Sequence, residues 1–224
     1  KRMNKSDEAI QILKTVLNNN HKIDSTNYKI GDCYFSKSQG LRKQGDHGAE
    51  KTTSYENAIL YYDQTLNQNV KYFSAYIQKY KVLHNLNKHK DAIIVMNQAI
   101  SIFPDSLSLV LYRGVAKGKL GDYKSEMDDL NQVIESKKKL DSSEISTAFR
   151  FRGILNKKNT HLNLALHDFN NAIIYNDDDG EAYLARAILY REMNFSDSAC
   201  QDYRKAADLG YIHLFETIKE YCNK

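Results

Sequence analysis

One position, usually occupied by alanine, recurs at a regular spacing, and this regularity constrains the fold more than any other feature of the sequence. Three of the five intervals between neighbouring members of the series are 34 residues long. The other two, of 49 and 39 residues, are explained as the same unit lengthened by insertions of about 15 and about 5 residues. The series is Ala9, Ala58, Ala92, Glu126, Ala165 and Ala199. A fixed period of about 20 to 50 residues is typical of stacked repeats, so we expect one elongated domain over residues 1–224.

The composition predicts helices throughout this array. The chain has a single proline, Pro104, and no tryptophan, and it lacks the alternating apolar and polar pattern of strands. We therefore predict an all-α protein. No apolar run approaches the roughly 18 residues that a membrane span needs, and Lys1 to Lys5 lead directly into a polar helix. We expect neither membrane insertion nor a signal peptide in this sequence.

Each repeating unit has the pattern of two helices that pack closely against each other. The first helix carries an aromatic residue at repeat position 4 and a small residue at position 8. The second carries alanine at position 20, a large apolar residue at 24 and a small one at 27. The fifth unit has Tyr183, Ala187, Ala199, Tyr203 and Ala206 at these places. Small residues let two helix backbones approach, and the large side chains fill the space beside them.

This pattern, with Gly121, Asp122 and Tyr123 in one connecting loop, resembles the tetratricopeptide repeat. The resemblance covers nearly the whole chain and implies a right-handed α-solenoid of antiparallel helix hairpins. It divides the chain into a partial repeat at 1–23, repeats at about 24–72, 73–106, 107–145, 146–179 and 180–210, and a capping helix at 211–222. A capping helix covers the apolar face that the last repeat would otherwise expose.

The longer insertion lies around Ser38 to Thr53 and contains three glycines. It is expected to form a loop, or a helix extension that ends in a loop. Both a functional and a passive role for it are open.

The resemblance also implies where a ligand binds. In the tetratricopeptide repeat family, the first helices line a concave face, and positions 2, 5, 9, 12 and 13 contact the ligand. With Tyr112 at the neighbouring position 6 added, the candidate residues are Tyr28, Asp32, Ile77, Lys81, His84, Leu111, Tyr112, Val115, Arg150, Ile154, Lys157, Leu184, Ile188 and Arg191. One subgroup grips a terminal carboxylate with Lys and Asn at positions 5 and 9. Tyr28 and Asp32 stand there in this chain, so we do not expect that type of recognition.

A concave face with aliphatic patches and more cations than anions suits an extended or helical peptide that carries acidic residues. We therefore expect a non-catalytic scaffold that binds a protein or peptide. One alternative is a helical repeat protein that binds nucleic acid, although a net charge of +4 from 32 basic and 28 acidic side chains does not favour it. Another is the scaffold part of a larger multidomain protein. Any self-association is expected at the N-terminal end.

Three units carry an arginine at position 7 and an aspartate at position 23, always 16 residues apart. The pairs are Arg113 with Asp129, Arg152 with Asp168, and Arg186 with Asp202. The two positions lie opposite each other in an antiparallel hairpin, so a charge-assisted hydrogen bond between the helices is the preferred interpretation. The alternative is a row of arginines that binds an acidic ligand.

The sequence offers little for catalysis or for holding a metal or cofactor. The histidines fall at unrelated repeat positions, and no catalytic or phosphate-binding motif is present. His84 and His89 are five residues apart and would not share a helix face, so we interpret them as surface residues. We expect no enzyme activity, no cofactor and no metal site.

Three cysteines make no metal-binding spacing. Counted outward from the turn near Gly210, Cys200 and Cys222 lie about level on two neighbouring helices. They are expected to form a disulfide if the protein is exported and to be free thiols if it is cytosolic. The compartment is therefore open.

Overall fold

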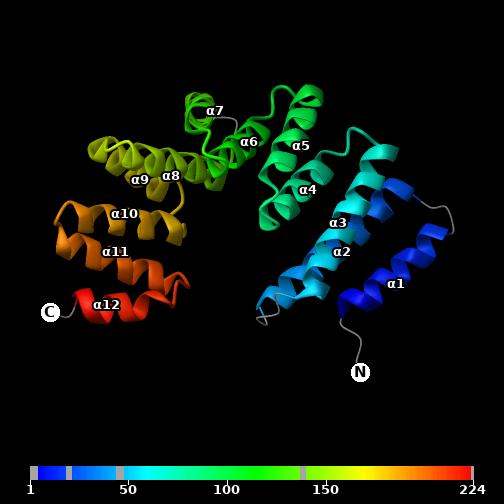
Figure 1. The fold of residues 1–224 in the computed structure, drawn as a ribbon, viewed down its shortest axis with the longest axis horizontal. Coiled ribbons are helices and arrows are strands. Elements are labelled where there is room, and N and C mark those ends of the chain that lie inside the picture. Colours follow the sequence, from blue (N-terminus) through cyan, green and yellow to red (C-terminus); the bar gives the residue numbers. More distant parts are fainter. Residues whose placement is uncertain (1–4, 19–21, 44–47, 137–139, 223–224) are drawn as a thin grey trace. The chain divides into compact units, whose positions relative to one another are not determined.

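The computed structural model describes residues 5–18, 22–43, 48–136 and 140–222. These residues form α-helices and no strand, which confirms the predicted all-α class. They fall into two compact units, residues 1–120 and residues 121–224, and each is described by itself (Figure 1). None of the helices described is both long and apolar enough to cross a membrane. The single elongated domain stays a prediction.

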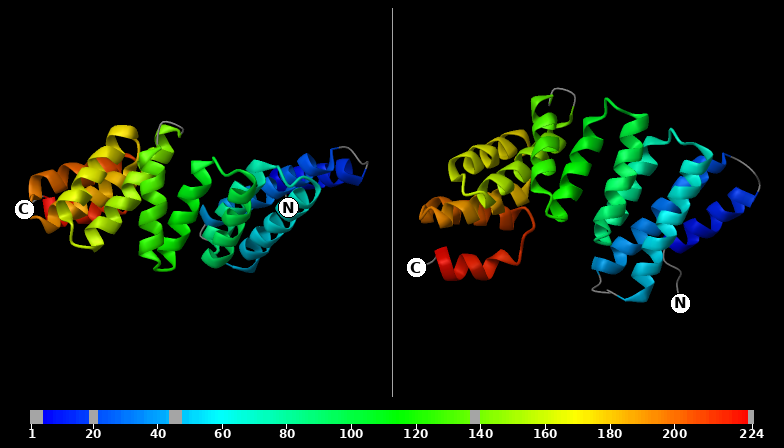
Figure 2. Two further views of the ribbon diagram at one scale, coloured as in Figure 1. Left: turned by 90° about the horizontal axis from the view of Figure 1, so that it is seen from above. Right: turned by 45° about the horizontal axis from the view of Figure 1, so that its top comes forward.

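The helices follow one another as antiparallel pairs within each unit. Unit 1 contains α1 (Lys5–Asn18), α2 (Ile23–Lys43), α3 (Ala49–Gln68), α4 (Phe73–Asn85), α5 (His89–Ile102) and α6 (Leu107–Lys119). Unit 2 contains α7 (Tyr123–Glu135), α8 (Ser142–Lys158), α9 (Leu162–Tyr175), α10 (Gly180–Glu192), α11 (Ser196–Asp208) and α12 (Leu214–Cys222). Figures 1 and 2 both show α2 beside α3 in unit 1 and α10 beside α11 in unit 2.

The recurring position of the sequence is the centre of the core. Ala58, Ala92, Ala165 and Ala199 are all completely buried in the second helix of their hairpins. Glu126, the exception in the series, is buried as well, whereas Ala9 in α1 is only partly buried. The 34-residue period therefore marks where a second helix approaches its neighbours most closely.

Four hairpin turns share one backbone feature at repeat position 15. The residues there adopt a left-handed conformation, with φ of +57° at Asn87, +83° at Gly121, +62° at Thr160 and +64° at Asn194. Glycine and asparagine adopt this conformation readily, and it ends the first helix. After Asn194, the amide of Phe195 donates to the carbonyl of Tyr190 at 2.8 Å, which closes the turn. Local sequence thus fixes where each first helix ends.

Two glycines at repeat position 8 let an aromatic ring reach the opposing helix. A Cβ atom on Gly31 would lie 2.7 Å from the Tyr62 ring, and one on Gly153 would lie 2.7 Å from the Phe169 ring. Both distances are too short for any larger side chain. The small–large pairing expected from the sequence is therefore a direct contact between α2 and α3 and between α8 and α9.

The longer insertion lengthens both helices of the first hairpin. α2 continues to Lys43 and α3 begins at Ala49. Residues 44–47, and residues 137–139 of the shorter insertion, lie outside the described part of the chain. Lys37 of α2 makes ion pairs with Asp7 of α1 at 2.9 Å and with Glu50 of α3 at 3.0 Å. Lys37, just before the insertion, therefore links α1, α2 and α3.

The last helix, α12, is fastened to α11 at its far end. Cys200 and Cys222 form a disulfide with a Cα–Cα distance of 5.6 Å. Close by, the Tyr221 hydroxyl donates to the Ser196 hydroxyl at 3.1 Å. Leu214, at the start of α12, is buried in the same core cluster as Tyr203. The predicted capping segment is thus a helix that covers one face of α11.

Candidate functional site

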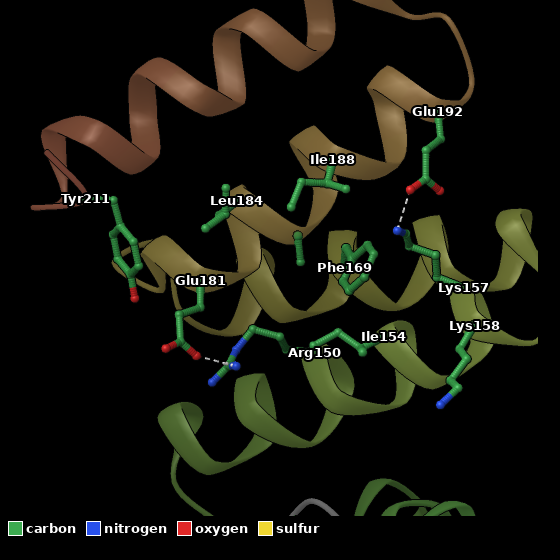
Figure 3. A pocket seen from close by; sticks show the side chains of 11 residues that line it. Arg150, Ile154, Lys157, Lys158, Phe169, Glu181, Leu184, Ile188, Glu192 and Tyr211 are labelled. Atoms are coloured by element: carbon green, nitrogen blue, oxygen red, sulfur yellow. Dashed lines mark hydrogen bonds and ion pairs between the residues drawn. The ribbon is translucent and has the colours of Figure 1, made fainter. Parts of the chain in front are cut away.

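A groove of ≈600 Å³ opens between α8 and α10 in unit 2 (Figure 3). It is lined by Arg150, Ile154, Lys157, Lys158, Phe169, Glu181, Leu184, Ala185, Ile188, Glu192 and Tyr211. Five of these were expected at the ligand face from the sequence: Arg150, Ile154, Lys157, Leu184 and Ile188. The groove is the place where the structure brings the largest number of candidate residues together.

The middle of the groove is apolar. Ile154 of α8 is 44% exposed, and Leu184 and Ile188 of α10 are half-buried beside it. Phe169, fully buried, forms the bottom of the groove, and it approaches α8 closely because Gly153 has no side chain. An exposed aliphatic side chain in a concave apolar surface is available to a partner's side chain.

One end of the groove is closed by a network around Arg150. The Arg150 guanidinium binds Asp179 through Nε at 3.0 Å and Glu181 through Nη1 at 2.5 Å. The Ser146 hydroxyl donates to the same Asp179 oxygen at 2.9 Å. Burial, together with the nearby Glu181 carboxylate, raises the pKa of the Tyr211 hydroxyl. Arg150 is therefore neutralised by the protein's own carboxylates.

The other end carries a second ion pair between the same two helices. Lys157 of α8 binds Glu192 of α10, with 2.5 Å between Nζ and Oε1 (Figure 3). Next to it, the ammonium of Lys158 lies 3.5 Å from the centre of the Tyr123 ring, a cation–π contact. The groove thus has an apolar middle between two ion pairs that bridge α8 and α10.

The predicted Arg–Asp pairs within hairpins are confirmed for two of the three repeats. Arg152 binds Asp168 through Nε and Nη2, at 3.1 and 2.7 Å. Arg186 binds Asp202 through the same two nitrogens at 2.7 and 2.8 Å. Neither arginine lines the groove, so the structure does not support these two as a row of ligand-binding cations. Arg113 and Asp129 belong to different units.

The residues at position 7 also make a contact that was not expected from the sequence. Each also binds position 25 of the preceding repeat, and the arginine contacts are 2.8 to 3.2 Å long. The pairs are Lys79 with Asp63, Arg113 with Asn97, Arg152 with Asn131, and Arg186 with Asn170. The recurrence of asparagine at 97, 131 and 170, in step with the arginines, was the signal available in the sequence. These contacts join one repeat to the next.

The first candidate residues of unit 1 are engaged with aromatic neighbours. Tyr28 stacks on Tyr72 with 4.9 Å between ring centres. Asp32 accepts a hydrogen bond of 2.7 Å from the Tyr62 hydroxyl. Burial raises the pKa of the Asp32 carboxyl and, with the nearby Asp32 charge, that of the Tyr62 hydroxyl. Lys81 remains exposed.

The other candidates in unit 1 are mostly part of its core. Ile77 and Tyr112 pack against the cluster around Tyr80. Leu111 and Val115 are 1% and 6% exposed, so their side chains offer almost no surface to a ligand. Arg191 of unit 2 is exposed but does not line the groove.

The interpretation of His84 and His89 as surface residues needs correction. His84 lies in the last turn of α4 and His89 begins α5, and their ring centres are 5.2 Å apart. Both residues are partly buried, and the Nδ1 atom of each is inaccessible to solvent. The turn between the helices brings the rings together, although no single helix face would.

Comparison with known proteins supports the family inferred from the sequence. Residues 74–106, which comprise nearly all of α4 and α5, match the family model described as Tetratricopeptide repeat. No curated protein sequence matches the chain.

Solved structures with the same fold cover most of the chain at low sequence identity. A tetratricopeptide repeat protein from Parabacteroides merdae aligns over 96% of this chain and 90% of its own, with TM-score 0.64 and 19% identity. YrrB, described as a TPR protein with an unusual peptide-binding site, aligns over 90% of this chain and 94% of its own, with TM-score 0.54 and 16% identity. Yeast Tom70 aligns over 94% of this chain but 41% of its own, with TM-score 0.70 and 17% identity.

These likenesses show the fold, and the family model identifies one of its repeats by sequence. The repeat that it matches is continued along the chain by the same period, the same left-handed turn residue and the same buried alanine position. By sequence, residues 74–106 are a tetratricopeptide repeat, and the fold of the chain is that of solved tetratricopeptide repeat proteins.

Proposed function

We propose that this chain is a non-catalytic scaffold that binds a protein or peptide, and that the groove between α8 and α10 is its binding surface. The observation that carries the proposal is the groove itself, because five of the residues expected at the ligand face line it. YrrB, which shares the fold, carries a peptide-binding site. A concave apolar surface with a few polar groups at its ends suits a short peptide segment.

The partner's chemistry follows from the balance of charges in the groove. Arg150 is matched by Asp179 and Glu181, and Lys157 is matched by Glu192. A ligand therefore meets two neutral ion pairs and one further cation, Lys158, whose ammonium lies over the Tyr123 ring. One lysine gives little support to a preference for acidic peptides. We propose instead that the segment binds through one or two aliphatic or aromatic side chains placed over Ile154 and Ile188.

The ion pairs in the groove also argue against nucleic acid as the partner. Phosphate binding requires cations that are free to release counterions, whereas the two cations that bridge α8 and α10 are held by carboxylates.

The Cys200–Cys222 disulfide supports a location in an oxidising compartment.

The proposal is tested with peptides selected on the intact chain from a random phage-displayed library. Their affinity for Ile154→Asp and Ile188→Asp variants is then measured by fluorescence polarisation. Burying an isoleucine side chain contributes about 1.5 to 3 kcal/mol, so each variant is expected to bind roughly 10- to 100-fold more weakly.

Leu164→Asp is the matched control, because Leu164 is 56% exposed on α9 and does not line the groove. It is expected to bind the selected peptides as the unmodified chain does. Binding that survives both groove substitutions, or that declines steeply with salt as for a nucleic acid, would contradict the proposal.

A further inference from the structure

The short link between α11 and α12 carries one residue of the groove. Tyr211 lies three residues after the end of α11 and three before the start of α12, and its ring lines the groove beside Glu181 (Figure 3). A Cβ atom on Gly180, the first residue of α10, would lie 2.6 Å from this ring. The Tyr211 carbonyl accepts a hydrogen bond of 3.0 Å from the Leu214 amide at the start of α12. A displacement of α12 therefore acts directly on one end of the groove.

Two further groove residues rest on a core cluster that α12 completes. Leu184 and Ile188 of α10 line the groove and also pack against the cluster that contains Tyr203 of α11 and Leu214 of α12. Tyr211 packs against the same cluster. A side chain that loses its packing partners regains rotamer freedom and no longer presents a fixed surface. The apolar middle of the groove therefore depends on α12 being in place.

α12 has few means of holding its place by itself. A helix of nine residues is too short to be stable in water without tertiary contacts. Of these nine residues, all of which the structure describes, Leu214 alone is buried. At the other end of the helix, its attachments to α11 include the Cys200–Cys222 disulfide and the hydrogen bond from Tyr221 to Ser196. A hydrogen bond contributes less to stability than a disulfide, so the disulfide is the stronger of these two attachments.

We propose that the Cys200–Cys222 disulfide is a redox switch for the groove, and this inference rests on the function proposed for that groove. In the oxidised form, α12 is fixed and the groove binds its peptide. In the reduced form, α12 separates from α11, the side chains of Tyr211 and Leu184 lose their support, and the peptide is released. The partner is thus held in an oxidising compartment and released where thiols are kept reduced.

The reaction is a thiol–disulfide exchange with a dithiol, such as a reductant protein with two neighbouring cysteines. Cys222 is half-buried, whereas Cys200 is 7% exposed, so the first thiolate of the dithiol attacks the Sγ atom of Cys222. The bond between the two cysteines breaks, and Cys200 leaves as a thiolate. The second thiolate of the dithiol then attacks the first sulfur of the dithiol in the mixed disulfide, and Cys222 leaves in the same way. The dithiol becomes a disulfide, and its two protons and two electrons pass to Cys200 and Cys222.

The test uses the full chain and those selected peptides whose binding Ile154→Asp and Ile188→Asp weaken. Their affinity is measured by fluorescence polarisation before and after reduction with dithiothreitol, and again after reoxidation. Reduction should weaken binding at least about tenfold, the loss expected when one large apolar side chain no longer contacts the ligand, and reoxidation should restore the affinity. Hydrogen exchange should show that reduction removes amide protection from α12 and leaves that of α8 unchanged.

A chain that carries both Cys200→Ser and Cys222→Ser should bind as weakly as the reduced chain and should not respond to dithiothreitol. Cys33→Ser is the matched control, because Cys33 is a free thiol in unit 1. This variant should keep both the affinity of the oxidised chain and its response to reduction.

Three outcomes would contradict the redox switch. Equal affinities of the oxidised and reduced chains would overturn it and leave the groove as the binding surface. Loss of amide protection throughout unit 2 on reduction would also overturn it, because the disulfide would then stabilise the whole unit. If the oxidised chain binds no peptide, the function proposed for the groove fails, and the switch fails with it. The unmodified chain gives each of these answers even if the double variant does not fold.

Discussion

The two units use equivalent repeat positions in opposite ways. In unit 1, positions 5 and 9 of the first full repeat hold Tyr28 and Asp32, which are engaged by Tyr72 and Tyr62. In unit 2, the same positions of the fourth repeat hold Arg150 and Ile154, which line an open groove. A repeat position therefore does not define a binding surface by itself. The sizes of the neighbouring side chains decide whether the face is filled or left open.

The contacts between consecutive repeats differ between the units as well. In unit 2, each position-7 arginine reaches both the aspartate of its own hairpin and the asparagine of the preceding repeat, as Arg152 and Arg186 show. In unit 1, Lys79 makes only the contact with the preceding repeat, to Asp63. A guanidinium has several donors in a planar fork, whereas an ammonium is a single point of charge. We infer that the arginine contacts join their repeats more firmly.

The largest expected effect comes from the contact that Lys79 lacks, the one between a position-7 arginine and the aspartate of its own hairpin. Asp168→Ala removes a carboxylate that is 1% exposed and leaves Arg152 and Asn156 without their common acceptor. Breaking a buried ion pair costs about 3 to 5 kcal/mol, and we expect the lower end because Arg152 is partly exposed. Asp63→Ala removes a carboxylate that is 43% exposed and pairs with Lys79, so it should cost less, about 1 kcal/mol. Urea unfolding followed by circular dichroism measures both, and equal losses would remove the distinction between the units.

The second-largest effect, the loss of stability when a helix-contact glycine is replaced by alanine, is expected to be the same in both units. Gly31→Ala and Gly153→Ala place a Cβ atom 2.7 Å from Tyr62 and Phe169 respectively. Overpacking of this kind costs about 1 to 3 kcal/mol, partly offset by the gain of up to about 1 kcal/mol when alanine replaces glycine in a helix. Gly40→Ala is the control, because nothing lies within 4 Å of its Cβ position, and it should stabilise the chain. If Gly31→Ala were also stabilising, the close contact between α2 and α3 would be in doubt.

The smallest expected effect is a pH dependence of stability that arises from two histidines in unit 1. The pKa values of His84 and His89 are lowered, chiefly by burial, so the folded state binds fewer protons than the unfolded state. Their contribution to stability is therefore present above the ordinary histidine pKa of 6.5 and is lost as the pH falls through the lowered values. The urea midpoint should decrease on acidification in buffer containing EDTA. The decrease should be smaller in a His84→Gln, His89→Gln double variant, and an identical pH profile for both proteins would exclude these histidines as its cause.

Much of the fold was predictable from the sequence because repeats are specified by local patterns. The period located the buried alanines, and the interval of 16 residues located the pairs of Arg152 with Asp168 and Arg186 with Asp202. The contacts with asparagine were not predicted, because they join positions in two different repeats. They depend on how one hairpin packs on the next, which no pattern within a single unit specifies.

The sequence by itself determined the repeat length, the all-α class and the positions at which helices come close, since each depends on residue size and period along the chain. Only the tertiary structure decided which candidate residues share an open groove, which are buried, and that His84 meets His89 across a turn. Those outcomes depend on which side chains from neighbouring helices occupy the same space. A period fixes the face of a helix on which a residue lies, but packing against the next helix decides whether that face remains accessible.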